Sequence, residues 1–243
     1  MENMIYLGIK IAVAAVLAVL FGNGCVVVFN RMPIRWFEDL DEQGNRVLPP
    51  ALQAQGDGSR QRLTSTPWKY LFVAFFGAAG VFLALREPVQ YEVAALCILA
   101  VVLLMAVADA KYRIVPDQLS ILLAVSAVGL VGFHEDWWEP VAGAGVGILL
   151  ALSVWGLGRI LYRRDVIGGA DLKFYAAMGL IAGRAGILIV FVLTQLLMGA
   201  HGLWLVLRRE AKAGEGRAML PYAFAAVTVF LLFLWDAGKR MVF

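Results

Sequence analysis

The chain has 243 residues, of which 61% are hydrophobic and 16% are charged, and its mean hydropathy is +0.78. These values exclude an ordinary soluble domain and predict a protein that is solvated by lipid. The formal net charge of +3 is small and is divided among several loops, so it favours neither a nucleic-acid surface nor an acidic partner.

The chain begins with an apolar run from Ile5 to Phe29, which is long enough to cross a bilayer. No small-residue cleavage site separates this run from a polar mature region, so we expect a retained first helix rather than a signal peptide. The polar stretch over residues 31–67 follows. Because it has little apolar content, we expect a loop that could not form a packed domain alone.

Apolar runs of spanning length continue along the rest of the chain. One run, from Phe174 to Ala182, is too short for an ordinary crossing and predicts either a tilted crossing that continues from Asp171 or a re-entrant helix. With this run included, the sequence predicts an all-α, polytopic transmembrane bundle of about eight helices. The clear spans are 5–29, 69–86, 92–110, 118–133, 141–162, 186–207 and 219–235.

Basic residues alternate between the two ends of these helices. Most of the 21 Lys and Arg lie in four loops, over residues 31–69, 111–113, 159–173 and 208–217. Because cytoplasmic loops carry an excess of Lys and Arg, we expect these loops to be cytoplasmic and both termini to lie on the non-cytoplasmic side. The sequence thus predicts a multi-pass protein of the inner (cytoplasmic) membrane.

Neither cysteine lies in a pattern that indicates a metal site. Cys25 and Cys97 both lie inside apolar runs, without a nearby CxxC or Cys/His spacing. We therefore expect buried free thiols, with no disulfide framework and no bound metal.

Three acidic residues lie at the ends of apolar runs, on the side predicted to be cytoplasmic. Asp109 ends one run, Asp117 begins the next helix and Asp171 begins the short one. An ionisable group at membrane depth is costly and often marks a functional site. Asp is also a common N-cap, which is the alternative interpretation for Asp117 and Asp171. Asp109 is a poor cap, because the C-terminal end of a helix disfavours negative charge.

Asp109 and Asp171 together have the chemistry of an aspartyl protease. In such a pair the ionised carboxylate takes a proton from a shared water, while the protonated carboxyl hydrogen-bonds the scissile carbonyl. Two carboxylates that share one proton titrate as a unit, so we assign neither role to one residue. The small residues Gly168, Gly169 and Ala170 allow a tight turn, and they allow another helix or an extended substrate to approach Asp171.

These segments resemble the type IV prepilin peptidases, a family of membrane aspartyl proteases with a GxGD signature. Asp109 is followed by Val115-Pro116-Asp117-Gln118-Leu119-Ser120, which is similar to the family's Ile/Leu-Pro-Asp-x-Leu-Thr segment. Gly168, Asp171 and Lys173 match GxGDxK, with Ala170 where the family usually has Gly. The end of the first helix, Val26–Pro33, and the start of the last helix, Met219–Phe224, also resemble the family. The resemblance implies that Asp109 and Asp171 are the catalytic residues.

The resemblance also implies a substrate and a reaction. The expected activity is cleavage of the short basic leader from type IV prepilin-like or pseudopilin precursors at the cytoplasmic membrane face, without a cofactor. The expected partners are these precursors and the lipid bilayer, with no nucleic acid. Which precursor is cut, and the oligomeric state, stay open.

Bifunctional members of this family also methylate the new N-terminus from S-adenosylmethionine. On this basis residues 1–86 are predicted to be a methyltransferase-like region and residues 87–243 the aspartyl peptidase bundle. Many such members have two CxxC pairs in the first cytoplasmic loop, whereas residues 31–67 contain no cysteine. The family's GSFLN-like run is also altered here, to Gly22-Asn23-Gly24-Cys25-Val26, so methylation stays open.

Other residues near the two aspartates are predicted to support the site or to bind substrate. Lys111 and Lys173 each lie two residues from a candidate catalytic Asp, although membrane anchoring on the cytoplasmic side is the favoured interpretation for both. His201 lies within an apolar run and is expected to make a packed or hydrogen-bonded helix contact. The predicted supporting residues are Gly168, Gly169, Lys111, Asp117 and Lys173.

The alternative function comes from a different class of protein. A small proton-coupled transporter could use Asp109 and Asp171 as a relay. Such a protein is expected to have charged residues at mid-membrane depth and discontinuous helices in both halves. The acids of this chain cluster at one membrane interface instead, which favours the peptidase.

Overall fold

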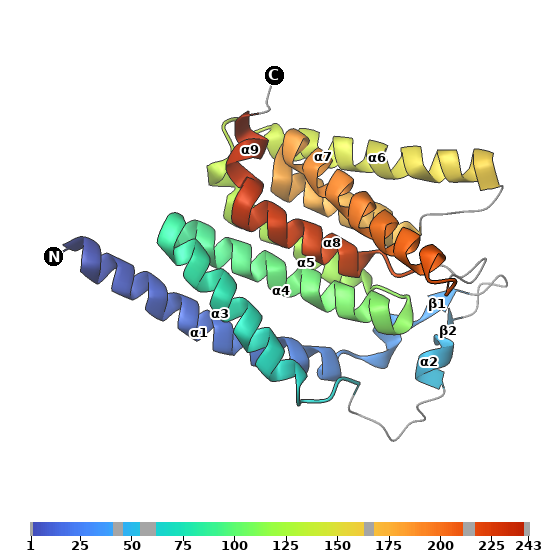
Figure 1. Cartoon of the computed structure of the whole chain (residues 1–243), viewed down its shortest axis with the longest axis horizontal. Coiled ribbons are helices and arrows are strands. Elements are labelled where there is room, and N and C mark those ends of the chain that lie inside the picture. The colour runs from blue at the N-terminus through green and yellow to red at the C-terminus, as the bar shows by residue number, and fades with distance from the viewer. Residues whose placement is uncertain (1, 41–45, 54–61, 163–167, 211–216, 241–243) are drawn as a thin grey trace. The chain divides into compact units, whose positions relative to one another are not determined.

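The computed structural model describes residues 2–40, 46–53, 62–162, 168–210 and 217–240. These residues are helical apart from connecting segments and one short antiparallel hairpin of β1 (Asp39–Leu40) and β2 (Arg46–Val47) (Figure 1). The all-α class predicted from the sequence is therefore confirmed. Parts of the loops predicted to be cytoplasmic, over residues 41–45, 54–61, 163–167 and 211–216, lie outside the described residues.

Six helices within the described residues are long and apolar enough to cross a membrane. A shorter apolar helix consists of α5 (Asp117–Ser126) and the 3-10 helix Ala127–Phe133. Two short helices, the 3-10 helix Ile34–Phe37 and α2 (Pro50–Gln53), lie in the polar stretch near the N-terminus. The six long helices are α1 (Glu2–Arg31), α3 (Trp68–Arg86), α4 (Val89–Tyr112), α6 (Glu139–Tyr162), α7 (Gly169–Leu207) and a last helix formed by α8 (Leu220–Val229), a π-helical turn (Phe230–Leu234) and α9 (Trp235–Arg240).

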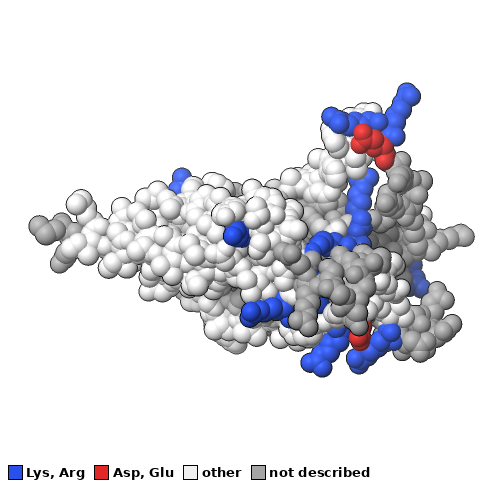
Figure 2. All heavy atoms as spheres, turned by 90° about the horizontal axis from the view of Figure 1, so that it is seen from below, with Lys and Arg blue, Asp and Glu red and all other residues white. Residues whose placement is uncertain are grey.

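The surface of these helices is suited to lipid. On the face that Figure 2 shows, most of the surface belongs to residues other than Lys, Arg, Asp and Glu. Large apolar side chains are exposed along α6, among them Leu149, Leu157 and Ile160. Because water would penalise such a surface, the predicted polytopic membrane protein is confirmed. The orientation of the termini stays a prediction.

The chain divides into two compact units, Met1–Leu104 and Met105–Phe243, with the division inside α4. In the first unit α1 packs along α3. The two backbones approach most closely at Gly22, where an added Cβ would lie 2.3 Å from Val73 Cγ2 and 2.6 Å from Val73 Cα. Helices can approach this closely only where one of them has a small residue. Gly22 therefore has a packing role between α1 and α3.

Replacing Gly22 with Ala is expected to destabilise the chain by about 2 kcal/mol, because the new methyl group would overlap the Val73 backbone. Gly24→Ala is the matched control, since a Cβ at Gly24 meets nothing within 4 Å. That control is expected to be neutral or stabilising, because Ala favours a helix over Gly by about 1 kcal/mol. Thermal unfolding of both variants in detergent measures the difference. Equal unfolding temperatures would contradict the close approach at Gly22.

Polar side chains also fasten α1 within the first unit. The Asn30 side chain donates a hydrogen bond to the Leu63 carbonyl at 2.9 Å and accepts one from the Leu63 N–H at 2.7 Å. Nearer the start of α1, the buried Lys10 side chain interacts electrostatically with the buried Glu92 carboxylate of α4. Opposite charges at membrane depth partly offset each other's cost of desolvation.

In the second unit α7 is a helical hairpin. Gly183 has φ +70° and ψ −177°, a backbone conformation that essentially only glycine adopts. Tyr175 and Phe191 lie on opposite sides of Gly183, yet their ring centroids are 5.3 Å apart. Along a straight helix they would be separated by about 24 Å. The helix therefore turns back at Gly183 into a first arm, residues 169–182, and a second arm, residues 184–207.

This hairpin accounts for the short apolar run of the sequence. The first arm is a separate helix. The described residues therefore contain eight apolar helices, as predicted, with Asp117–Phe133 counted as one. At 1.5 Å per residue the first arm is about 21 Å long, shorter than the roughly 30 Å hydrocarbon core of a bilayer. The structure thus places Asp171 on a helix that is shorter than a usual transmembrane span.

Candidate active site

Asp109 lies in the last turn of α4, and its side chain is buried. Its carboxylate accepts a hydrogen bond from the backbone N–H of Leu220 at 2.9 Å. Leu220 is the first residue of α8, where backbone N–H groups lack partners within the helix and carry partial positive charge. As the sequence predicted, Asp109 does not cap its own helix. Instead, it stabilises the start of α8. This contact offsets its unfavourable position at the end of α4.

Asp171 lies in the first turn of α7. Its carboxylate accepts a hydrogen bond from the backbone N–H of Gly168 at 3.3 Å. Gly168, with φ −80°, is the N-cap residue, and Asp171 is three residues beyond it. The N-cap interpretation of Asp171 is therefore wrong, because Gly168 occupies the N-cap position. The Asp171 side chain nevertheless accepts a hydrogen bond from the Gly168 N–H at the start of the helix. Asp117 is likewise inside its helix, because Pro116 occupies the N-cap position of α5.

The fold brings Asp109 and Asp171 together within the second unit. Their carboxyl groups are close enough for the two charges to interact. The two residues come from the end of α4 and the start of α7. Backbone N–H groups of Leu220 and Met219 hold Asp109, and that of Gly168 holds Asp171. This arrangement is a pair of positioned carboxylates at one end of a helix bundle.

Two of the predicted supporting residues form an ion pair beside this site. Lys173 Nζ lies 2.6 Å from Asp117 Oδ1, which connects the start of α7 to the start of α5. The Lys173 and Asp117 side chains are 50% and 62% exposed, so their ion pair contributes about 1 kcal/mol or less to the stability of the fold. Lys111 is exposed, and its ammonium group lies 5.7 Å from the centre of the Tyr112 ring. Gly168 and Gly169 are exposed next to Asp171.

Sequence reasoning missed Tyr175. This residue is fully buried one helical turn after Asp171, close enough to interact with its carboxylate. The Tyr175 hydroxyl donates a hydrogen bond to the Met219 sulfur at 3.5 Å, and it also interacts with Thr194 of the second arm. Met219 precedes Leu220, so Tyr175 connects the Asp171 helix to the segment that holds Asp109. The four-residue spacing from Asp171 was the only signal of this role in the sequence.

Glycines position the first arm of α7 against α6. An added Cβ at Gly147 of α6 would lie 2.2 Å from the Tyr175 carbonyl oxygen. One at Gly143 would lie equally close to the Gly179 carbonyl oxygen, and one at Gly179 would lie 2.2 Å from the Gly143 carbonyl oxygen. Gly143 and Gly147 are four residues apart, the spacing that lets membrane helices meet backbone to backbone. The position of Asp171 therefore depends on two glycines of α6.

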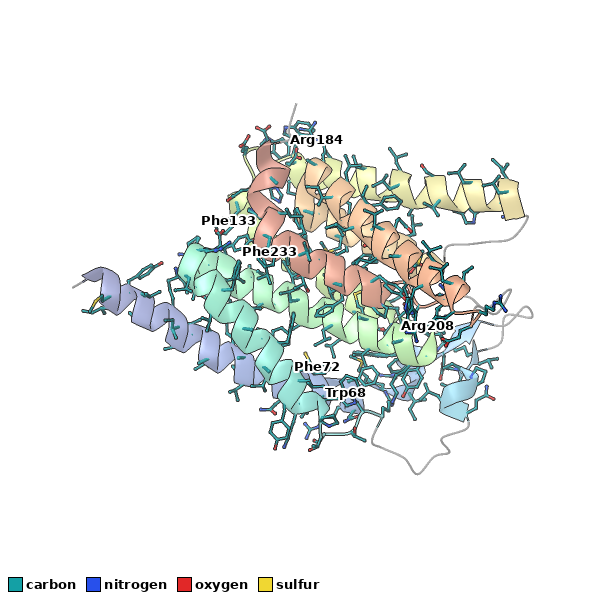
Figure 3. All side chains as sticks on the ribbon, in the orientation of Figure 1. Trp68, Phe72, Phe133, Arg184, Arg208 and Phe233 are labelled. Carbon is teal, nitrogen blue, oxygen red and sulfur yellow. The ribbon has the colours of Figure 1, made fainter. Side chains whose placement is uncertain are left out.

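The turn of α7 is held at the far end of the same unit. Figure 3 shows Arg184 where the two arms meet and Arg208 at the other end of the second arm. The buried Glu139 carboxylate accepts hydrogen bonds from the Arg184 backbone N–H at 2.9 Å and from its Nε at 2.8 Å. The imidazole of His134 is 3.1 Å from the Ile181 carbonyl oxygen. Polar contacts thus hold the turn of α7 at Gly183, and glycine packing holds its first arm against α6.

Two further predictions concern residues outside the aspartate pair. His201 hydrogen-bonds the Tyr222 hydroxyl and stacks on Trp204, so the predicted helix-contact role is confirmed. Cys25 is buried and Cys97 is half-buried, and both are free. Among the described residues no group of three or more His, Cys, Asp or Glu side chains could hold a metal ion.

Comparison with known proteins bears on the region that contains both aspartates. Residues 96–203 match the type IV leader peptidase family. The resemblance seen in the sequence is therefore confirmed. The type IV leader peptidase match extends from α4 into the second arm of α7, and it includes Asp109, Asp117, Asp171 and Lys173.

Curated relatives share the family's name. A prepilin leader peptidase/N-methyltransferase of Xanthomonas campestris is 29% identical over 133 residues, which is 52% of this chain and 44% of the relative. Proteins with the same name from Klebsiella pneumoniae and Bacillus subtilis are 31% identical over 108 residues and 25% identical over 152 residues. These matches cover 44% and 61% of this chain, and 46% and 56% of the relatives. The chain spans about half the length of the curated relatives it matches, and no solved structure matches it significantly.

Proposed function

We propose that this chain is a membrane aspartyl endopeptidase that removes the short basic leader from type IV prepilin-like or pseudopilin precursors. Asp109 and Asp171 are its catalytic residues in this proposal. The observation that carries it is the approach of their two carboxyl groups inside the region that matches the type IV leader peptidase family. The names of the curated relatives support the same substrate class.

The proposed mechanism uses one ionised and one protonated carboxyl. The ionised carboxylate takes a proton from a water molecule, whose oxygen then bonds to the carbonyl carbon of the scissile peptide. The protonated carboxyl hydrogen-bonds the carbonyl oxygen and stabilises the negative charge that develops there. When the carbon–nitrogen bond breaks, the leaving amine receives the proton that the first carboxylate took from the water, which returns that carboxylate to its ionised form. The N–H groups of Leu220 and Gly168 hold the two carboxylates in orientation throughout.

The position of the pair on the helices suits a substrate that is itself anchored in the membrane. Asp109 ends α4 and Asp171 begins α7, both at ends that the distribution of Lys and Arg assigns to the cytoplasm. A precursor with its basic leader in the cytoplasm and its apolar helix in the bilayer would present the scissile bond at this depth. We accordingly propose the inner membrane as the location.

The relatives' names favour N-methylation of the product as a second candidate activity. In this proposal the region over residues 1–86 would contribute to methylation from S-adenosylmethionine, and residues 87–243 would contain the peptidase. The first cytoplasmic loop has no CxxC pair, so a methyltransferase here would work without the cysteine motif of many bifunctional members. The family match does not favour the alternative of a proton-coupled transporter.

The mass of a precursor after incubation tests both activities. The full chain in detergent or liposomes is mixed with a pilin-like precursor, with and without S-adenosylmethionine. Peptidase activity is expected to leave a product that has lost its leader. Methylation is expected to add the mass of one methyl group only when S-adenosylmethionine is present. An unchanged mass for every pilin-like precursor tested would overturn the proposed function.

A further inference from the structure

A groove opens beside the first turn of α7, next to Asp171. Its volume is about 210 Å³. None of the described side chains that line it is charged. The lining residues are Ala151, Leu152 and Trp155 of α6, with Gly168, Gly169 and Leu172 at the start of α7.

The α6 wall of this groove is open on the lipid side. Leu152 is 45% exposed and Trp155 is 37% exposed, and both lie on a helix long and apolar enough to span the membrane. Ile160, further along α6, is exposed to 77%. A molecule that occupies the groove would therefore reach it from the bilayer and would be apolar where it contacts α6.

The two glycines of the groove are not explained by the fold. Gly168 has φ −80°, which any residue can adopt. Within the described part of the chain, an added Cβ at Gly169 meets nothing within 4 Å, and one at Gly168 meets the Asp171 carboxylate at 3.9 Å. By contrast, a Cβ at Gly147 would lie 2.2 Å from a backbone oxygen. Among the described residues, what Gly168 and Gly169 provide is exposed backbone beside a candidate catalytic carboxylate.

We propose that this groove binds the apolar residues of the substrate that adjoin the scissile bond, with Trp155 and Leu152 as the residues that select them. The inference rests on the proposed function. An extended peptide suits the site better than a lipid chain does, because the Gly169 and Ala170 N–H groups have no acceptor within their helix. The next two N–H groups, of Asp171 and Leu172, already donate to the Gly168 carbonyl. Peptide carbonyls supply such acceptors and an acyl chain does not.

Filling the groove tests the inference. Gly169→Leu places a side chain in the groove where the fold leaves space, and Leu favours a helix over Gly. Cleavage of a precursor that the unaltered chain cuts is expected to fall on the order of ten-fold or more, mainly through a higher KM. Gly156→Leu is the matched control on α6, because a Cβ there also meets nothing within 4 Å and Gly156 does not line the groove. This control is expected to cleave normally.

A photo-crosslinking residue at position 152 separates the substrate from lipid and from an effect on Asp171 alone. In the Asp171→Asn background it is expected to attach to the precursor close to its uncut scissile bond. The same residue at position 156 is expected to attach to lipid. If the chain cuts precursors but Gly169→Leu cuts them equally well, or if position 152 attaches only to lipid, the groove is not the binding site. Failure of the unaltered chain to cut any precursor would overturn the proposed function instead.

Discussion

Asp109→Asn and Asp171→Asn are each expected to abolish leader removal, with a loss of roughly a thousand-fold or more. An amide cannot take the proton of the attacking water, and it cannot share one proton with the remaining carboxyl. The substitution is conservative for the fold, because the Asn side-chain oxygen can still accept the Leu220 N–H at position 109 or the Gly168 N–H at position 171. Cleavage of a precursor by purified variants measures the effect.

The control for this experiment is Asp136→Asn, the same chemical change at an exposed acid in the loop before α6. It is expected to insert, fold and cleave as the unaltered chain does. All three variants are expected to insert into the membrane at normal levels. If either Asp109→Asn or Asp171→Asn retains cleavage, the pair is not the catalytic site.

Gly147→Ala is expected to lower both stability and cleavage. The new methyl group would lie 2.2 Å from the Tyr175 carbonyl oxygen, so the first arm of α7 would have to move away from α6 and take Asp171 with it. Overpacking against backbone costs about 3 kcal/mol. Gly179→Ala, which meets the Gly143 carbonyl at the same distance, is expected to have the same effect from the other helix.

Gly145→Ala is the matched control on the same helix. A Cβ at Gly145 meets nothing within 4 Å, and Ala stabilises a helix by about 1 kcal/mol relative to Gly. The two substitutions, two residues apart, are therefore expected to shift thermal unfolding in opposite directions. Cleavage should fall in Gly147→Ala and persist in Gly145→Ala. Equal unfolding temperatures would show that the packing of α6 against α7 does not depend on the contact at Gly147.

Much of the fold could be predicted because apolar run length is a property of the sequence itself. The run from Phe174 to Ala182 predicted a short separate helix, and the structure has one in the first arm of α7. What the run could not predict is the reversal at Gly183, since glycine also occurs within straight membrane helices. Three helices also extend beyond the predicted spans, because polar residues of their last turns remain helical. They are α1, α4 and the last helix, which end at Arg31, Tyr112 and Arg240.

The sequence indicated the residues of the candidate site but not the contacts that they make. The unusual position of Asp109 at a helix C-terminus marked it, but no spacing rule could show that the start of α8 supplies its hydrogen bond. The pairing of Lys173 with Asp117 and the place of Tyr175 between two segments depend in the same way on how distant helices pack. Packing of that kind is decided by shape complementarity over many residues, which a single sequence does not display.

The hydrogen bond between Asp109 and Leu220 also shows that the candidate site needs residues beyond those that carry its motifs. The match to the type IV leader peptidase family covers residues 96–203, whereas a group that holds one of the two carboxylates comes from residue 220. A shortened gene product that stopped at the end of this match would retain both aspartates and the motifs immediately around them. It would nevertheless leave Asp109 without the Leu220 backbone donor that orients it, so the motifs alone would make an incomplete site look intact.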